Sequence, residues 1–128
     1  MTEAPVWTRL PSTGLAEMRK QMAAFRKVAN EEALSLKNCQ LALDRLQALY
    51  RGFTSTERVL VAKILAEWIL SEDETVRFDA MVLADRFRIR DVTPALSELA
   101  HRLRHSKVPS AVYELKQVDR LAAALAAG

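Results

Sequence analysis

The sequence predicts an all-α fold of about five to six helices in antiparallel pairs, and three observations support it. Ala and Leu dominate, with only three Gly and four Pro in 128 residues, a composition that favours helices. No Val/Ile/Thr alternation bounded by Asn-Gly or Asp-Gly is present, so β-hairpins are not expected. Residues 55–70 are apolar around most of a helical circumference, as in a buried helix.

The 55–70 segment is the natural centre of the fold. At about 16 residues it is too short for a convincing membrane span, so we expect the neighbouring segments to pack around it. The length of the chain predicts one helical domain over residues 13–128. Residues 1–12 contain two prolines and are expected to form an extended arm, which Trp7 could pin to the body.

Charge and cysteine content narrow the class of protein. A net charge of +3 does not by itself imply nucleic acid or an anionic membrane as partner. The single cysteine, Cys39, excludes an intrachain disulfide framework and fits a reducing compartment. Neither a secretory signal nor a long apolar run is visible, so a cytoplasmic protein that contacts no membrane is expected.

An apolar series with steps of three and four runs through residues 14–50. Its members are Leu15, Met18, Met22, Phe25, Ala29, Glu32, Leu36, Cys39, Leu43, Leu46 and Tyr50. A sustained period of 3.5 residues is typical of a coiled-coil seam, on which Cys39 would act as a small hydrophobe.

Two arrangements of this segment remain open. One unbroken helix would be about 54 Å long, whereas a compact domain of this size is about 36 Å across, so the helix would need a partner. Alternatively, Asn30 caps a second helix that begins with Glu31 and Glu32, and a break near Ala29–Asn30 gives an antiparallel hairpin. The first arrangement predicts a homodimer through seven residues: Leu15, Met18, Met22, Phe25, Leu36, Leu43 and Leu46.

Helix boundaries are marked by local signals. Gly52 is placed to end the first helical region, and Thr54 with Glu57 has the spacing of a capping box. Residues 71–74 repeat that spacing before a helix over residues 75–88. Thr93 is the expected N-cap, and Pro94 the first residue, of a helix to about His105. Pro109 is expected to open the last helix.

Residues 72–107 then show a known pattern. Val76-Arg77 is followed by Ala80, Leu83 and Ala84, and Pro94-Ala95-Leu96 follows a turn. This order resembles one HEAT-type repeat, without the small Gly turn, where residues 86–90 stand. A weak second copy begins about 35 residues later and lacks the Val-Arg pair. The resemblance implies stacked helix pairs that present a surface to other macromolecules, generally without catalysis.

Nothing in the sequence indicates an enzyme, a cofactor or a metal site. His101 and His105 are four residues apart, but no third ligand is evident. Cys39 has no neighbour that would activate it, and the carboxylates at 31–32 and 72–74 suit helix starts. Phosphate-binding, dinucleotide-binding and nucleophile-elbow motifs are missing.

Basic residues gather in the C-terminal half. They are Arg86, Arg88, Arg90, Arg102, Arg104 and Lys107. In antiparallel helices they would form two separate basic ends. These ends could contact a phosphate backbone, or they could simply be a solvated charged surface. The sequence thus favours a non-catalytic protein-interaction or adaptor module, homodimeric and with an unknown protein partner. A nucleic-acid-binding accessory protein is the alternative.

Overall fold

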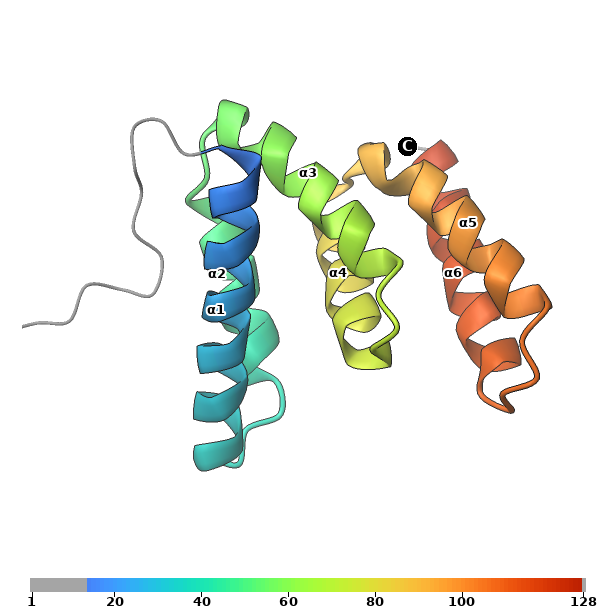
Figure 1. Cartoon of the computed structure of the whole chain (residues 1–128), viewed down its shortest axis with the longest axis horizontal. Helices are drawn as coiled ribbons and strands as arrows, with labels where there is room; N and C mark the ends of the chain where they lie inside the picture. The colour runs from blue at the N-terminus through green and yellow to red at the C-terminus, as the bar shows by residue number, and fades with distance from the viewer. Residues whose placement is uncertain (1–13, 128) are drawn as a thin grey trace, which may run out of the picture. The chain divides into compact units, whose positions relative to one another are not determined.

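The structure is a computed structural model that describes residues 14–127. These residues form six α-helices and one short 3-10 helix and contain no strand (Figure 1), so the all-α prediction is confirmed. The helices are α1 (Leu15–Ser35), α2 (Leu41–Arg51), α3 (Ser55–Ile69), α4 (Glu74–Phe87), η1 (Arg90–Val92), α5 (Thr93–Arg104) and α6 (Ala111–Ala127).

The helices gather into two compact units. The first ends at Val61 and the second begins at Ala62, so that α3 contributes to both. The sequence predicted a single domain over residues 13–128, and the structure adds this internal division. The expected arm at 1–12, with Trp7, lies outside the described residues. In the described part, every helix is too short or too polar to cross a lipid bilayer.

In the first unit, α1 and α2 pack side by side as a helical hairpin (Figure 1). Helix α1 runs through Ala29 and Asn30 and ends at Ser35. Both predicted arrangements of residues 14–50 are therefore wrong in detail, since the chain is neither unbroken nor broken near Asn30.

A Schellman motif accounts for the actual break. The Asn38 N–H donates to the Ala33 carbonyl at 2.9 Å, and the Lys37 N–H donates to the Leu34 carbonyl at 3.2 Å. Lys37 adopts the left-handed conformation that this motif requires, with φ of 54°. Glycine usually occupies that position, and a lysine there leaves little signal in the sequence.

The hairpin interior combines small and large apolar side chains. Ala29, Ala33 and Ala42 form a buried cluster against which Phe25 and Leu41 pack. Small side chains at a helix contact let the two backbones approach closely. Larger side chains of the two helices are also buried, namely Met18, Met22, Leu46 and Tyr50.

Helix α3 begins as predicted. The Thr54 N–H donates to Glu57 Oε1 at 2.7 Å, and the Glu57 N–H donates to Thr54 Oγ1 at 3.1 Å, which completes a capping box. The exposed side chains of Lys63 and Glu67 mark the narrow polar stripe. The buried residues of the apolar sides are Val61, Ala62, Ile64, Leu65, Trp68 and Ile69.

Helix α4 is capped differently from the prediction. Asp73 is the N-cap, and its Oδ1 accepts hydrogen bonds from the Thr75 N–H at 2.8 Å and the Thr75 hydroxyl at 2.7 Å. Ser71 instead accepts from the Asp73 N–H at 3.0 Å. The predicted capping box at residues 71–74 is wrong because the Ser71 hydroxyl serves the turn that precedes the helix.

The end of α4 and the start of α5 also differ in detail. Arg88 ends α4 in the left-handed conformation, with φ of 53°. Thr93 is the first residue of α5, after η1, and its hydroxyl donates to the Arg90 carbonyl at 2.8 Å. Its predicted N-cap role is wrong, because the N-cap side chain must accept a hydrogen bond from the backbone.

The second unit is built on the packing of α5 against α6, and α4 also contacts α6. Each of these helices turns an apolar face inward. Fully buried members are Ala80, Leu83, Ala84, Ala95, Leu96, Leu99, Ala100, Ala111, Val118 and Leu125. Helix α6 starts at Ala111, two residues after the predicted Pro109.

Candidate interaction surfaces

The structure uses most of the predicted self-association residues inside the first unit. Met18, Met22 and Leu46 are fully buried there. Leu15, Phe25 and Leu43 are half-buried, and only Leu36 is exposed, at 63%. Most residues of the heptad seam are therefore covered at least in part by the chain's own packing.

The turn that joins α1 to α2 exposes apolar side chains. Leu34 is 81% exposed and follows the buried Ala33 on the last turn of α1. It lines a hollow of about 380 Å³ together with Asn30, Ala33, Lys37, Asn38, Cys39 and Ala42. Cys39 is exposed in this turn, so its predicted place on a buried seam is wrong. The seam is interrupted at residues 36–40, where the chain reverses.

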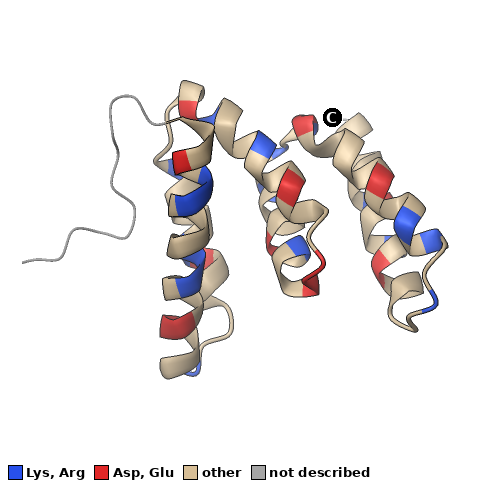
Figure 2. Ribbon diagram, in the orientation of Figure 1, with Lys and Arg blue, Asp and Glu red and all other residues tan. Residues whose placement is uncertain are grey.

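Lys and Arg residues are distributed over several helices (Figure 2), and the six basic residues fall at two places in the second unit. Arg86, Arg88 and Arg90 surround the end of α4, while Arg102, Arg104 and Lys107 surround the end of α5. The length of α5 separates the two groups by about 18 Å. The chain does not bring them together into one continuous patch.

Three of these cations already have carboxylate partners. Arg102 Nε lies 3.2 Å from Glu98 Oε2, and the pairs Arg104–Asp119 and Arg88–Asp85 are longer, at 3.8 Å and 3.9 Å. All three pairs are exposed and so contribute little to stability. Among the described residues, Arg86, Arg90 and Lys107 have no carboxylate partner.

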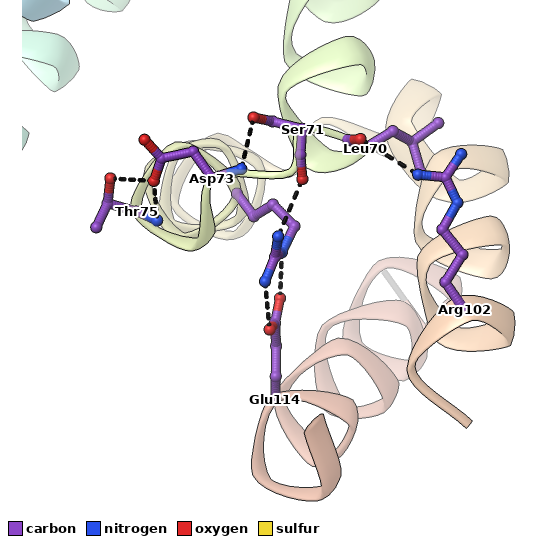
Figure 3. A network of polar contacts seen from close by, with 7 residues as sticks. Leu70, Ser71, Asp73, Thr75, Arg102 and Glu114 are labelled. Atoms are coloured by element: carbon purple, nitrogen blue, oxygen red, sulfur yellow. Dashed lines mark hydrogen bonds and ion pairs between the residues drawn. The ribbon is translucent and has the colours of Figure 1, made fainter. Parts of the chain in front are cut away.

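A buried ion pair joins α4 to α6 (Figure 3). Arg77 Nε lies 2.7 Å from Glu114 Oε2, and Arg77 Nη2 lies 2.8 Å from Glu114 Oε1. Arg77 Nη1 also donates to the Ser71 carbonyl at 3.0 Å. The side chains are only 14% and 7% exposed. Such bidentate geometry gives strong, directional charge-assisted hydrogen bonds.

Glu114 also raises the pKa of Arg77. Its hydrogen bonds raise the pKa of Arg77 above the ordinary value, against a smaller opposing effect of burial, and its negative charge adds to the rise. Glu74 and Asp73 contribute in the same direction. The guanidinium therefore stays charged at every pH at which proteins are ordinarily handled.

The pair lies at a cleft of about 510 Å³ in the second unit. The cleft is lined by Ser71, Glu72, Glu74, Arg77, Leu99, Arg102, Leu103, Ser106, Val108, Ser110, Ala111 and Glu114. On one wall, Arg102 Nη1 donates to the Leu70 carbonyl at 3.3 Å (Figure 3). The hydrogen bonds between Arg77 and Glu114 connect α4 to α6, and both helices contribute walls to the cleft.

Sequence reasoning missed this pair. The sequence pattern includes Arg77 only in the Val-Arg pair and gives Glu114 no role. A signal was nevertheless present, because Glu114 interrupts the buried face of α6 between Ala111 and Val118. A charged residue on a buried helix face is rarely left without a partner.

The candidate metal ligands remain a pair of histidines. His105 Nδ1 lies 2.9 Å from the His101 carbonyl oxygen, and the two ring centroids are 4.6 Å apart. Within residues 14–127 no group of three His, Cys, Asp or Glu side chains is placed to hold a metal ion.

Comparisons with protein-family models, with curated proteins and with solved structures found no significant match to this chain.

Proposed function

We propose that this protein is a non-catalytic protein-interaction module that forms a homodimer through the turn end of the α1–α2 hairpin. The observation that carries the proposal is the exposure of Leu34 and Leu36 beside the hollow at that end. Leu34 is the most exposed of the large apolar side chains in the described part of the chain. Leu36 belongs to the seam predicted for self-association.

The size of the effect can be worked from these two leucines. Burial of a leucine side chain contributes about 1.5–3 kcal/mol, so four leucines in a symmetric pair of copies contribute about 6–12 kcal/mol before costs. Association itself costs at least about 4 kcal/mol in lost motion. The difference is about 2–8 kcal/mol, and its upper part corresponds to a reversible dimer with a dissociation constant of about 1–100 µM, which we expect here.

The test is the solution mass by size exclusion with light scattering, from about 5 to 500 µM protein, a range that brackets the expected constant. We expect the mass to rise from 14.4 kDa toward twice that value. The L34E/L36E variant should stay monomeric, because charged side chains cannot be buried unpaired. V59E/V108E, which changes two exposed valines elsewhere, is the matched control and should dimerise like the parent chain. A parent chain that is monomeric throughout, or a dimer that survives L34E/L36E, would refute the proposal.

The HEAT-type unit over residues 72–107 is part of the same proposal. Arg88 supports it, because it adopts a left-handed conformation at the point where the family has a small Gly turn, and glycine is the usual residue in that conformation. In that family, stacked helix pairs present their surfaces to other macromolecules, which agrees with an interaction module.

The alternative, binding of nucleic acid, is favoured by one observation. Arg86 and Arg90 are exposed at the end of α4 and have no carboxylate partner among the described residues. Fluorescence anisotropy with a labelled duplex tests it, and the expected affinity falls by about tenfold or more between 50 and 200 mM salt. Absence of binding at about 50 mM salt would remove this alternative.

A further inference from the structure

The outward side of α6 carries a second feature suited to recognition. Tyr113, Lys116, Gln117 and Arg120 line a depression of about 280 Å³. Tyr113 is 69% exposed, and the adjacent Val112 is exposed as well. All four lining residues come from one helix, and the proposed hairpin interface uses none of them.

The spacing of the four residues identifies the kind of depression. They stand at positions i, i+3, i+4 and i+7, which are neighbours on a helix surface. In helix-to-helix packing, four residues of one helix form the hole that accepts a side chain of the facing helix. The depression therefore has the form of a hole without a knob.

Charge on this side of α6 indicates the chemistry of the missing helix. Lys116 and Arg120 are exposed, lie one turn apart, and have no carboxylate partner in the described residues. The nearby acidic groups are engaged, since Glu114 faces inward to Arg77 and Asp119 pairs with Arg104. Beyond Arg120, α6 has only Ala and Leu.

We propose that the outer side of α6 docks an acidic amphipathic helix of a partner protein. An apolar side chain of that helix enters the hole beside Tyr113, and its flanking carboxylates meet Lys116 and Arg120. The alanines after Arg120 allow the two backbones to come close. A second copy of α6 is a poor occupant, because its own Lys116 and Arg120 would repel these cations.

Aromatic and basic side chains together also suit single-stranded nucleic acid. The helix is favoured because the hole follows helical spacing and offers one aromatic ring, whereas strand binding uses a groove with a series of rings. Single-stranded DNA is therefore included as a competing probe.

The experiment uses the full chain labelled with ¹⁵N and two designed peptides of about three heptads. Both carry Leu at the seam, and the flanking positions are Glu in one peptide and Lys in the other. We expect the Glu peptide to bind with a dissociation constant of about 10–300 µM and to shift the amide signals of α6 around Tyr113 to Arg120. The Lys peptide should not bind.

Two matched variants separate a specific surface from overall charge. K116E/R120E and R86E/R90E each reverse two exposed, unpartnered cations, so both lower the net charge equally. We expect K116E/R120E to weaken binding of the Glu peptide by about tenfold or more, and R86E/R90E by less than about twofold. Y113A should weaken binding by about threefold to tenfold. All variants should keep the parent circular dichroism spectrum.

Three outcomes would overturn the proposal. They are no binding of the Glu peptide up to about 1 mM, equal losses in the two charge variants, and tighter binding of oligo(dT) than of the peptide at the same amides. The L34E/L36E variant should bind the peptide normally. Failure of the hairpin dimer and failure of the α6 site are thus distinguishable.

Discussion

The buried pair between Arg77 and Glu114 makes a sharp prediction for stability. The substitution E114Q keeps the size of the side chain but removes its charge and one of the two acceptor oxygens. Arg77, at 14% exposure, would then lose its carboxylate partner, with only the more distant charges of Glu74 and Asp73 still acting on it. Removal of one partner of a buried ion pair costs about 3–5 kcal/mol, and the remaining amide oxygen still accepts one hydrogen bond. We therefore expect E114Q to cost about 2–4 kcal/mol.

The assay is urea unfolding followed by circular dichroism at pH 7. A loss of 2–4 kcal/mol is a large share of the roughly 5–15 kcal/mol that holds a domain together, so the unfolding midpoint should fall clearly. The control is E32Q, which removes the negative charge from the Arg45–Glu32 contact of 3.1 Å. That pair has similar contact length but both members are exposed, so its loss should cost less than about 1 kcal/mol.

The result that would refute the reasoning is an E114Q midpoint no lower than that of E32Q. A double variant, R77M/E114L, adds a second check. Replacement of a buried ion pair by apolar side chains of similar volume is often neutral, so the double variant should recover most of the loss.

The pKa of Arg77 is raised in the fold. Its charge therefore stabilises the fold at all pH values below its ordinary pKa, and this stabilisation is lost only as the pH rises above that value. Raising the pH from 7 to about 10 should therefore leave the contribution of Arg77 unchanged.

Two further predictions concern helix ends. T54A removes the hydroxyl that accepts the Glu57 N–H and should cost about 1 kcal/mol in urea unfolding, whereas T56A, at an exposed position inside α3, should cost less; equal losses would contradict the capping box. K37G and R88G should each raise the stability by about 0.5–1 kcal/mol. The left-handed conformation costs about 1–2 kcal/mol for a residue with a side chain, and the greater freedom of glycine in the unfolded chain offsets part of the gain. A lower midpoint for either glycine variant would show that the residue it replaces is not strained.

Local chemistry explains which boundaries were predictable. The capping box of Thr54 and Glu57 involves two side chains and one turn of backbone, so its spacing alone identifies it. Ser71 has the same spacing to Glu74, but the turn before α4 needs its hydroxyl and leaves the cap to Asp73. The two possibilities differ by two residues, and only the path of the chain decides between them.

The left-handed residues show a different limit. Lys37 and Arg88 end helices at positions where glycine is the usual signal. Tertiary packing holds them there: Ile89, next to Arg88, is buried, and the Ala33 and Ala42 contact fixes the hairpin around Lys37. Packing of the neighbouring segments thus overrules local propensity at Lys37 and Arg88, and that packing cannot be deduced from the residues at the helix end alone.

The heptad seam shows why self-association could not be assigned from spacing. An apolar stripe with steps of three and four can pack equally well on a helix of the same chain or on a helix of another copy, because both offer the same kind of apolar surface. In this chain the reversal at residues 36–40 supplies a facing helix, and Met18, Met22 and Leu46 are buried within the chain. The apolar residues that remain available to partners are those outside the inward-facing pattern, such as Leu34 and Tyr113. For a small helical protein, a binding surface is therefore best sought at large apolar side chains that the packing of the chain itself leaves exposed.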